Sequence, residues 1–266
     1  MYTARDHTFM ICAYGNSPDL ENCILSVLNQ NILGTVLMST STPNEYITGL
    51  AKKYDLPLVV NSGKGDQVDN LNFAFLQAQT KLVTLCHQDV YYCPEYLEKI
   101  LTCANKGNQP IIIFTDYFEI RSGKRVDTGK LLKIKQILNF PLRFSALWGS
   151  KWVRRRILSL GDPICNPSVT FNKSVLINPP FVDGYQAAPD WDAWERLSLL
   201  SGEYIYCPDK LVGNGINENS GTTETIANGI RRKEDYEMFC RFWPPVIAKV
   251  LLKIYSTAES SNTIVK

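Results

Sequence analysis

The sequence predicts an α/β fold in which a mostly parallel central sheet carries helices on both faces. Within the first 116 residues, short apolar segments with strand character alternate with segments whose apolar residues recur at helical spacing. This alternation is typical of parallel strands joined by crossover helices. The chain has 266 residues, 45% of them apolar, which is enough for a substantial core.

The predicted elements follow one another without a linker. Residues 8–14 are expected to form a buried strand, and residues 17–30 a helix with Ser17 as its cap and Pro18 at its first position. Strands and helices are then expected in alternation at residues 35–40, 43–54, 57–60, 66–78, 81–86, 94–105 and 110–120.

One edge of this sheet is the expected ligand site, because ligands in such folds bind beyond the carboxyl ends of the strands. The side chains that follow predicted strands are those of Tyr14, Ser39, Ser41, Asn61, Gly63, His87 and Asp89. Any one of them alone is as consistent with a simple turn as with a binding site.

After residue 116 the pattern is less regular. The expected elements are a hairpin at 120–126, a strand leading into a short helix at 168–176, a helix at 191–202 and a strand at 203–208. The segment that begins at residue 226 predicts two helices divided by Pro244 and Pro245.

Positive charge is concentrated in one stretch, although the net charge of the chain is only +2. Residues 128–161 contain no Asp or Glu, and their cations are Lys130, Lys133, Lys135, Arg143, Lys151, Arg154, Arg155 and Arg156. Phe140, Phe144, Trp148 and Trp152 are interleaved with these cations. Two interpretations remain open: a helical subdomain that buries these aromatic residues and solvates its charges, or a peripheral contact with an anionic membrane surface or a lipid-diphosphate acceptor. Nucleic acid is not an expected partner, since the chain is nearly neutral and has no recognised binding motif.

The sequence predicts a cytoplasmic protein with reduced thiols. It contains eight cysteines without a CxxC pair, no segment of signal-peptide type and no apolar stretch long enough to span a membrane. If the basic stretch contacts a membrane, the expected location is the inner face of the cell membrane.

A single carboxylate, Asp89, follows the predicted strand at 81–86, within the segment "CHQDVYY". Mg²⁺ and Mn²⁺ bind hard oxygen ligands, and nucleotide phosphates complete their coordination shell. The residues themselves leave open whether this segment is a metal site or only a turn.

Three segments in order resemble the inverting family 2 glycosyltransferases with the GT-A fold, particularly bacterial members that assemble surface polysaccharides. They are "ICAYGNSPDLENCILSVLNQ", "NSGKGDQVDNLNFAFLQAQTKLVTLCHQD" and "PDWDAWERLSLLSG". The resemblance extends over about residues 8–225. It implies a GT-A domain at 1–225, with a nucleotide-binding half at 1–116 and an acceptor-side half at 117–225. Residues 226–266 would form a C-terminal helical extension.

The resemblance implies which residues contact the nucleotide of the donor. Ala13 and Tyr14 would lie at the nucleobase, where the Tyr14 ring can stack on a pyrimidine, or else pack at the strand end. Ser39 and Ser41 stand where the family commonly has a base-reading carboxylate, so UDP is the preferred carrier without being required. The other nucleotide-binding residues assigned in this way are Asp69, His87 and Gln88.

The resemblance also implies a divalent metal, Mn²⁺ or Mg²⁺, held by Asp89 and Asn217. His87 stands where the family has another carboxylate, and Asn217 stands where it often has a histidine. A site with so little negative charge is expected to hold the metal weakly and only together with the donor. His87 is equally consistent with a metal ligand, a donor to ribose or phosphate, and a loop residue.

The predicted catalytic base is Asp190, which aligns with the acidic motif at the start of a helix. Inverting transfer needs one carboxylate to take a proton from the acceptor hydroxyl. Asp192 and Glu195 fit a capping box at the same helix, so Asp192 is expected to cap the helix or to bind the acceptor.

The implied activity is sugar transfer from a nucleotide-diphosphate donor, such as a UDP-sugar, to a hydroxyl of a glycan or glycolipid. The alternative is a glycosyltransferase-like fold without turnover that serves as a binding or partner subunit, as the substitutions at Ser39, His87 and Asn217 suggest. A dinucleotide-dependent oxidoreductase is disfavoured, because no GxGxxG follows the first strand.

Overall fold

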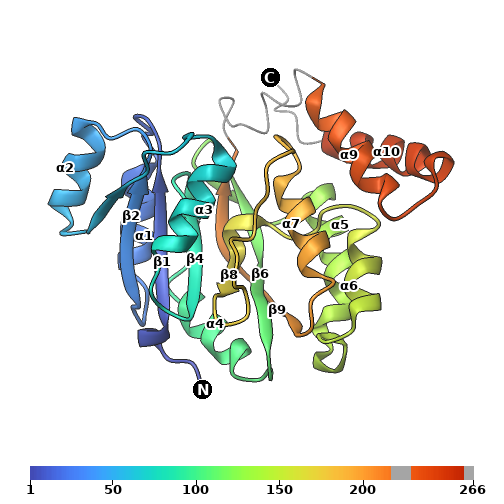
Figure 1. Cartoon of the computed structure of the whole chain (residues 1–266), viewed down its shortest axis with the longest axis horizontal. Helices are drawn as coiled ribbons and strands as arrows, with labels where there is room; N and C mark the ends of the chain where they lie inside the picture. Colours follow the sequence, from blue (N-terminus) through green and yellow to red (C-terminus); the bar gives the residue numbers. More distant parts are fainter. Residues whose placement is uncertain (217–228, 261–266) are drawn as a thin grey trace.

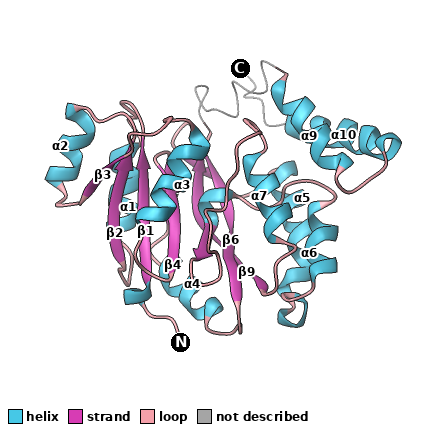
Figure 2. Ribbon diagram, viewed as in Figure 1, coloured by secondary structure: helices cyan, strands magenta, loops and turns pink. Residues whose placement is uncertain are grey.

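The computed structural model of the chain describes residues 1–216 and 229–260 and confirms the α/β class (Figure 1). A single twisted sheet is covered by helices on its faces (Figure 2). The strands are β1 (His7–Ala13), β2 (Thr35–Thr40), β3 (Leu58–Val60), β4 (Leu82–His87), β5 (Val90–Tyr92), β6 (Pro110–Arg121), β7 (Lys124–Val126), β8 (Val169–Asn172) and β9 (Glu203–Gly215). The α-helices are α1 (Leu20–Leu28), α2 (Glu45–Lys53), α3 (Gln67–Gln77), α4 (Tyr96–Ala104), α5 (Lys130–Asn139), α6 (Lys151–Leu158), α7 (Pro189–Leu197), α9 (Ile230–Cys240) and α10 (Pro245–Ser260).

The sheet has the strand order β3-β2-β1-β4-β8-β6-β9-β5, and β7 pairs with β6. β1, β2, β3 and β4 are parallel to one another, as the alternating pattern predicts. β8 is antiparallel to both β4 and β6. Because β8 runs in the opposite direction, the residues before it arrive at the edge where the parallel strands end. The 3₁₀ turn η4 (Asn166–Ser168) therefore lies at that edge.

Two features of the sheet near β9 differ from those the sequence predicts. β9 continues past residue 208 to Gly215, and a register shift near Asp116 of β6 allows the longer pairing. The end of β9 pairs with β5, which the sequence did not predict and which has only three residues. The segment after "CHQD" is thus a strand at the edge of the sheet.

α7 is held against the sheet by two buried indoles. Trp194 stacks on Phe171 of β8 at 5.8 Å between ring centroids, and Trp191 meets Phe239 of α9 edge-on at 4.9 Å. Both tryptophans are almost fully buried, and each such side chain contributes about 2–3 kcal/mol through burial. The two contacts fix α7 between β8 and α9.

The capping box expected at Asp192 and Glu195 is absent. α7 begins at Pro189, so Asp192 lies inside the helix and is paired with Arg196 at 2.8 Å and Arg241 at 2.7 Å. Glu195 is paired with Arg155 and Arg241. These two carboxylates tie α7 to α6 and α9.

Glu234 of α9 supplies the cap that α7 lacks in its own sequence. Its carboxylate accepts hydrogen bonds from the backbone N–H groups of Gln186, Ala187 and Ala188 at 2.7–3.1 Å. Unpaired N–H groups before a helix are costly when buried, and a charged acceptor satisfies three of them here. The start of α7 therefore depends on α9.

Three of the eight cations in region 128–161 point inward. Arg154 is buried and donates to the carbonyl oxygens of Leu200 and Gly202. Arg155 is paired with Glu195, and the Lys135 ammonium lies 5.3 Å from the centre of the Tyr117 ring. The remaining five cations are exposed. The region is therefore helical, and its contact with a membrane stays a prediction.

Replacing Glu234 with Ala is expected to lower the free energy of unfolding by about 3 kcal/mol, because three N–H groups lose a charged acceptor. Urea denaturation measures this loss. Glu237→Ala on the same helix is the matched control, since Glu237 is exposed and lies 3.9 Å from Lys233; it should cost less than about 1 kcal/mol. Equal losses in the two variants would show that Glu234 does not hold α7.

Candidate active site

The predicted ligand edge is confirmed as the place where loops from separate strands meet. The loops after β1 and β2 are joined, since Gly15 N–H donates to Thr42 Oγ1 at 2.7 Å and Asn44 donates to the Gly15 carbonyl oxygen at 3.2 Å. Tyr14 N–H donates to Gln88 Oε1 at 2.8 Å, which ties the loop after β1 to the turn between β4 and β5. The structure thus brings Tyr14 and Gln88 together.

The Tyr14 side chain projects away from the protein. It is 56% exposed, whereas Ala13 before it is buried as the last residue of β1. The alternative of a tyrosine packed at the strand end is therefore wrong, and the ring is free to stack on a ligand.

The two serines predicted at the nucleobase differ in their surroundings. Ser39 is a buried residue within β2, opposite Cys12 of β1. Ser41 follows β2, and its buried Oγ has no hydrogen-bond partner among the described residues. A buried hydroxyl without a partner is unusual and indicates an atom that a ligand can satisfy. Ser41 is thus better placed than Ser39 to contact a ligand.

Asp69 is engaged in the loop that joins β3 to α3. Its carboxylate accepts hydrogen bonds from Gly65 N–H at 2.9 Å and from Asn61 Nδ2 at 2.8 Å, and these bonds hold the pKa of Asp69 below its usual range. A Cβ at Gly63 would lie 2.7 Å from this carboxylate, and Gly65 has φ +75°, so both positions require glycine.

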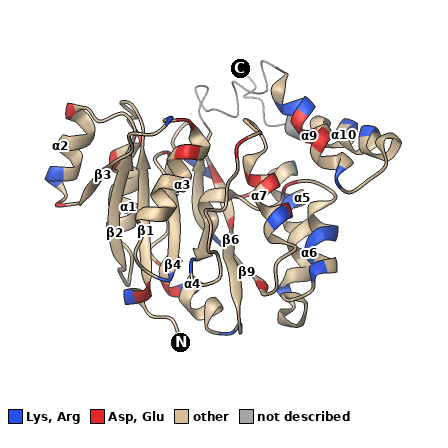
Figure 3. Ribbon diagram, in the orientation of Figure 1, with Lys and Arg blue, Asp and Glu red and all other residues tan. Residues whose placement is uncertain are grey.

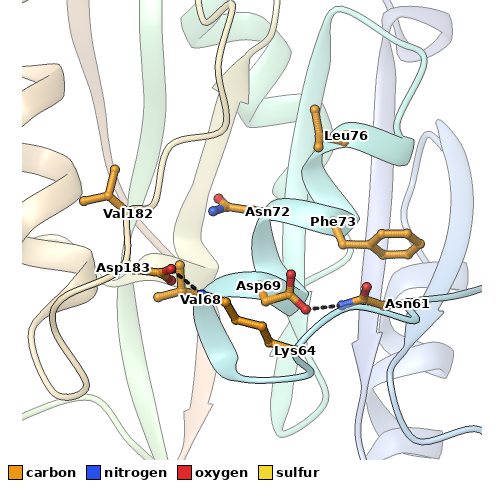
Figure 4. A pocket seen from close by; sticks show the side chains of 9 residues that line it. All are labelled: Asn61, Lys64, Val68, Asp69, Asn72, Phe73, Leu76, Val182 and Asp183. Atoms are coloured by element: carbon orange, nitrogen blue, oxygen red, sulfur yellow. Dashed lines mark hydrogen bonds and ion pairs between the residues drawn. The ribbon is translucent and has the colours of Figure 1, made fainter.

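Asp69 and Asn61 also line a pocket of 390 Å³ beside α3 (Figure 4). Lys64 and Asp183 form an ion pair at 2.5 Å across this pocket, and both side chains are mostly exposed. Exposed pairs of this kind contribute little to stability. The hydrogen bonds from Gly65 and Asn61 give Asp69 a role in shaping the loop. Its contact with a nucleotide stays a prediction.

His87 is the last residue of β4, and Asp89 lies in the turn between β4 and β5. Asp89 is partly exposed, and among residues 1–216 and 229–260 its carboxylate accepts no hydrogen bond that fixes it. Its carbonyl oxygen accepts a hydrogen bond from Gly215 N–H at 3.1 Å, which anchors the turn to the end of β9. Burial of the imidazole lowers the pKa of His87, and the nearby Asp89 carboxylate opposes this effect. His87 is therefore neutral at pH 7.

Asn166 joins this turn to Asp190. Its Nδ2 donates to Asp190 Oδ1 at 3.0 Å and lies 3.4 Å from His87 Nε2. An ionised carboxylate requires the NH₂ side of the amide to face it, so the same group donates to His87 Nε2. The His87 proton is then on Nδ1. Asn166 Oδ1 is buried and has no partner within the described part of the chain.

Asp190 lies in the first turn of α7, as the sequence predicts, and its side chain is in an unusual environment. Burial and the neighbouring carboxylate of Asp162 raise its pKa to about 7. The charges of Arg231 and Lys135 and the hydrogen bond from Asn166 lower the pKa of Asp190 and oppose this rise in part. A carboxylate with a pKa near the ambient pH is suited to take a proton from a weak acid such as a hydroxyl.

The residues of this turn fit a divalent metal only in part. Within residues 1–216 and 229–260, no group of three or more His, Cys, Asp or Glu side chains is arranged to hold a metal ion. Asp89 offers one carboxylate that accepts no hydrogen bond from the described residues, and His87 Nε2 lies 3.4 Å from Asn166 Nδ2. Mg²⁺ often binds through one or two carboxylates plus substrate phosphates. The donor set therefore suits an ion that arrives with a diphosphate.

Asn217, the other predicted metal ligand, lies outside the described residues. β9 leads toward it and ends at Gly215, beside Asp89.

Sequence reasoning missed three residues of this site: Asn166, Asp162 and Glu234. Asn166 and Asp162 lie in the segment "GDPICNPS", which leads into β8. The sequence pattern did not show that β8 runs antiparallel to β4. Because β8 is antiparallel, the residues before it lie at the ligand edge of the sheet, beside Asp190. Nothing local in the sequence marks Glu234 as a cap for α7, since 46 residues separate it from Ala188.

Comparisons with known proteins identify the family and the fold of the chain. The model of the family "Glycosyl transferase family 2" matches residues 8–159. No curated protein sequence matches the chain.

Several solved structures share the fold at low sequence identity. S. aureus TarS 1-349 in complex with UDP-GlcNAc is 14% identical, with a TM-score of 0.60, covering 96% of this chain and 73% of that one. The mannosyltransferase PcManGT from Pyrobaculum calidifontis, in complex with GDP-Man and Mn²⁺, is 13% identical, with a TM-score of 0.63 and coverages of 96% and 73%. Glucosyl-3-phosphoglycerate synthase from Mycobacterium tuberculosis, in complex with Mn²⁺ and UDP-glucose, is 14% identical, with a TM-score of 0.56 and coverages of 89% and 79%.

These likenesses establish the GT-A fold. The family model covers more than half of the residues, and the chain therefore belongs to glycosyl transferase family 2.

Proposed function

We propose that the protein is an inverting glycosyltransferase that moves a hexose from a UDP-linked donor to a hydroxyl of a glycan or glycolipid acceptor. The observation that carries this proposal is the link from Asp190 through Asn166 to the turn that holds His87 and Asp89. In that arrangement one carboxylate with a pKa of about 7 faces the turn that would receive the diphosphate. The acceptor class, and a role in bacterial surface polysaccharide synthesis, rest on the family resemblance.

Asp190 acts as the general base in this proposal. It takes the proton of the acceptor hydroxyl while that oxygen attacks the anomeric carbon from the side opposite the diphosphate. A single base is sufficient for inversion, and the carboxylates nearest to it along α7, Asp192 and Glu195, are held in ion pairs. They are therefore not available as a second base or a nucleophile.

The nucleotide would lie along the joined loops after β1, β2 and β3. Tyr14 would stack on the base, and the unpaired Ser41 hydroxyl would contact the base or ribose. TarS and the M. tuberculosis synthase were solved with UDP-sugars, which supports UDP as the carrier, while PcManGT was solved with GDP-Man.

A divalent ion would be held by Asp89 and by the diphosphate oxygens, with Asn217 as the other predicted ligand. When bound, it would neutralise charge on the leaving diphosphate. Two of the three similar structures described above contain Mn²⁺, which supports this part of the proposal.

The competing proposal is a fold that binds nucleotide without turnover. It is favoured by the burial of Ser39, which removes one of the two hydroxyls that stand where the family commonly has a base-reading carboxylate. The two proposals differ in one measurement, donor hydrolysis, which only an active transferase performs.

Asp190→Asn is expected to reduce donor hydrolysis or transfer about 10³-fold, because the base is lost. UDP binding, measured by calorimetry, should change less than about twofold, since Asp190 does not contact the nucleotide. Asp209→Asn, at an exposed carboxylate beside Lys99 of α4, is the control and should keep full activity. Equal loss of activity and UDP binding in Asp190→Asn would instead indicate a structural role.

The rate is expected to rise with pH through about 7, because Asp190 must be ionised to act and its pKa is about 7. Asn166→Leu removes a hydrogen bond that favours the ionised form, so the acid limb of the pH–rate profile should move up by about one unit. Asp162→Asn removes a repelling charge, so the limb should move down by a similar amount. A profile that keeps its midpoint in both variants would show that these residues do not set the Asp190 pKa.

A thermal-shift panel with UDP, GDP, CDP and dTDP, each with and without Mn²⁺, tests the carrier and the metal. UDP should give the largest shift, and Mn²⁺ should increase it. In Asp89→Ala the increment from Mn²⁺ should disappear while the shift from UDP alone remains. A larger shift with another nucleotide would contradict the carrier, and an unchanged Mn²⁺ increment in Asp89→Ala would contradict the metal ligand.

A further inference from the structure

One end of the molecule presents exposed apolar and basic side chains together. α5, α6 and α10 lie at the end of the long axis opposite α2, and lysines and arginines mark α6 and α10 (Figures 1 and 3). The exposed cations of region 128–161 are Lys130, Lys133, Arg143, Lys151 and Arg156. Within the described residues no helix is long and apolar enough to cross a membrane.

The end of α5 and the 3₁₀ turn η2 (Phe140–Arg143) form a pocket of 360 Å³ that apolar and cationic side chains line together. It is lined by Lys133, Gln136, Ile137, Phe140 and Arg143. Ile137 is 71% exposed and Phe140 52%, although both are large apolar side chains. The Arg143 guanidinium lies 5.9 Å from the centre of the Phe140 ring.

Further exposed aromatic rings stand beside cations at this end. Phe144 contacts Phe140 edge-on at 5.8 Å and is itself more than half exposed. On α6, Trp152 is 69% exposed and lies 5.6 Å from the Arg156 guanidinium. Large aromatic side chains that remain exposed among cations are suited to the interface between water and lipid.

α10 continues the same composition. Val246, Val250 and Ile254 are exposed at a spacing of four residues, so they share one face of the helix, and Lys249 and Lys253 are exposed beside them. Residues 245–256 contain no Asp or Glu. The α9–α10 corner is joined to α6, because Arg156 lies 5.1 Å from the Trp243 ring and the indole N–H donates to the Ser159 carbonyl oxygen.

We propose that this end of the chain binds the surface of a membrane that contains anionic phospholipids. The binding surface consists of Lys133, Ile137, Phe140, Arg143, Phe144 and Trp152, with the exposed face of α10 beside them. Lipid phosphates pair with the cations, while the apolar side chains enter the boundary between headgroups and acyl chains.

Charge distinguishes this occupant from a second copy of the chain. A symmetric dimer through this surface would bring the same cations of two copies together, with no acid in residues 128–161 to compensate them. An anionic lipid surface supplies the missing charge. The proposal is independent of the transfer reaction, because binding is measured without donor or acceptor.

Sedimentation of the full chain with vesicles tests the proposal. The chain should sediment with phosphatidylcholine vesicles that contain a fraction of phosphatidylglycerol, and not with phosphatidylcholine vesicles alone. Binding should weaken with added salt, since exposed charges are screened. Absence of binding to the anionic vesicles would overturn the proposal.

Two double variants separate the electrostatic contribution to membrane binding from the apolar contribution. Lys133→Glu with Arg143→Glu should reduce the partition coefficient about tenfold or more. Phe140→Ser with Phe144→Ser should reduce it about tenfold while leaving the salt dependence in place. The matched controls are Lys52→Glu with Lys106→Glu, and Leu33→Ser with Ile177→Ser, which alter exposed residues outside α5, α6 and α10.

The controls should bind as the unmodified chain does, and circular dichroism should show that all variants are folded. Equal losses in the Lys52/Lys106 control and the Lys133/Arg143 variant would overturn the proposal, since binding would then depend on net charge alone. A dimer found by light scattering and abolished by the Phe140/Phe144 substitutions would also overturn it, because the surface would then join two copies.

Discussion

The candidate active site depends on the carboxylate of Glu234. This side chain accepts hydrogen bonds from the N–H groups of Gln186, Ala187 and Ala188, the last residues before α7. Asp190 follows two residues later, so the position of its carboxylate is set by a residue on another helix. Arg241, at the end of α9, strengthens the same contact through Asp192 and Glu195. The C-terminal helices are thus part of the support of the site.

The second constraint is the reversed direction of β8. Because β8 is antiparallel to β4, the turn before it reaches the edge where β4 ends. Asn166 in that turn can then contact both His87 and Asp190. A parallel β8 would place the residues before it at the opposite edge of the sheet, and the donor side of the site would have no polar link to the proposed base.

Much of the fold and part of the site could be predicted from the sequence. Apolar periodicity located the strands and helices of the first half, and strand ends pointed to Tyr14, His87 and Asp89. Gln88 and Asp190 were assigned through the family resemblance, Asp190 by its alignment with an acidic motif at a helix start. Other roles depend on tertiary pairing and carry no local signal. Asp192 has the spacing of a capping box but meets Arg196 and Arg241 instead, and Ser39 follows the strand pattern yet is buried. Asn166 has no motif of its own, since its importance arises from two partners distant in the sequence.

The acidity of Asp190 is the central physical claim of this account. Burial and the charge of Asp162 raise its pKa to about 7, and the unfolded chain would restore the ordinary value of 3.8. Carbon-13 NMR titration of Asp-labelled protein measures this directly and needs neither donor nor acceptor. The account predicts one side-chain carboxyl resonance with a midpoint near pH 7, absent from the spectrum of Asp190→Asn. If every resonance in the folded protein titrates below about pH 5, Asp190 is an ordinary ionised carboxylate and the account of its role as a tuned base is wrong.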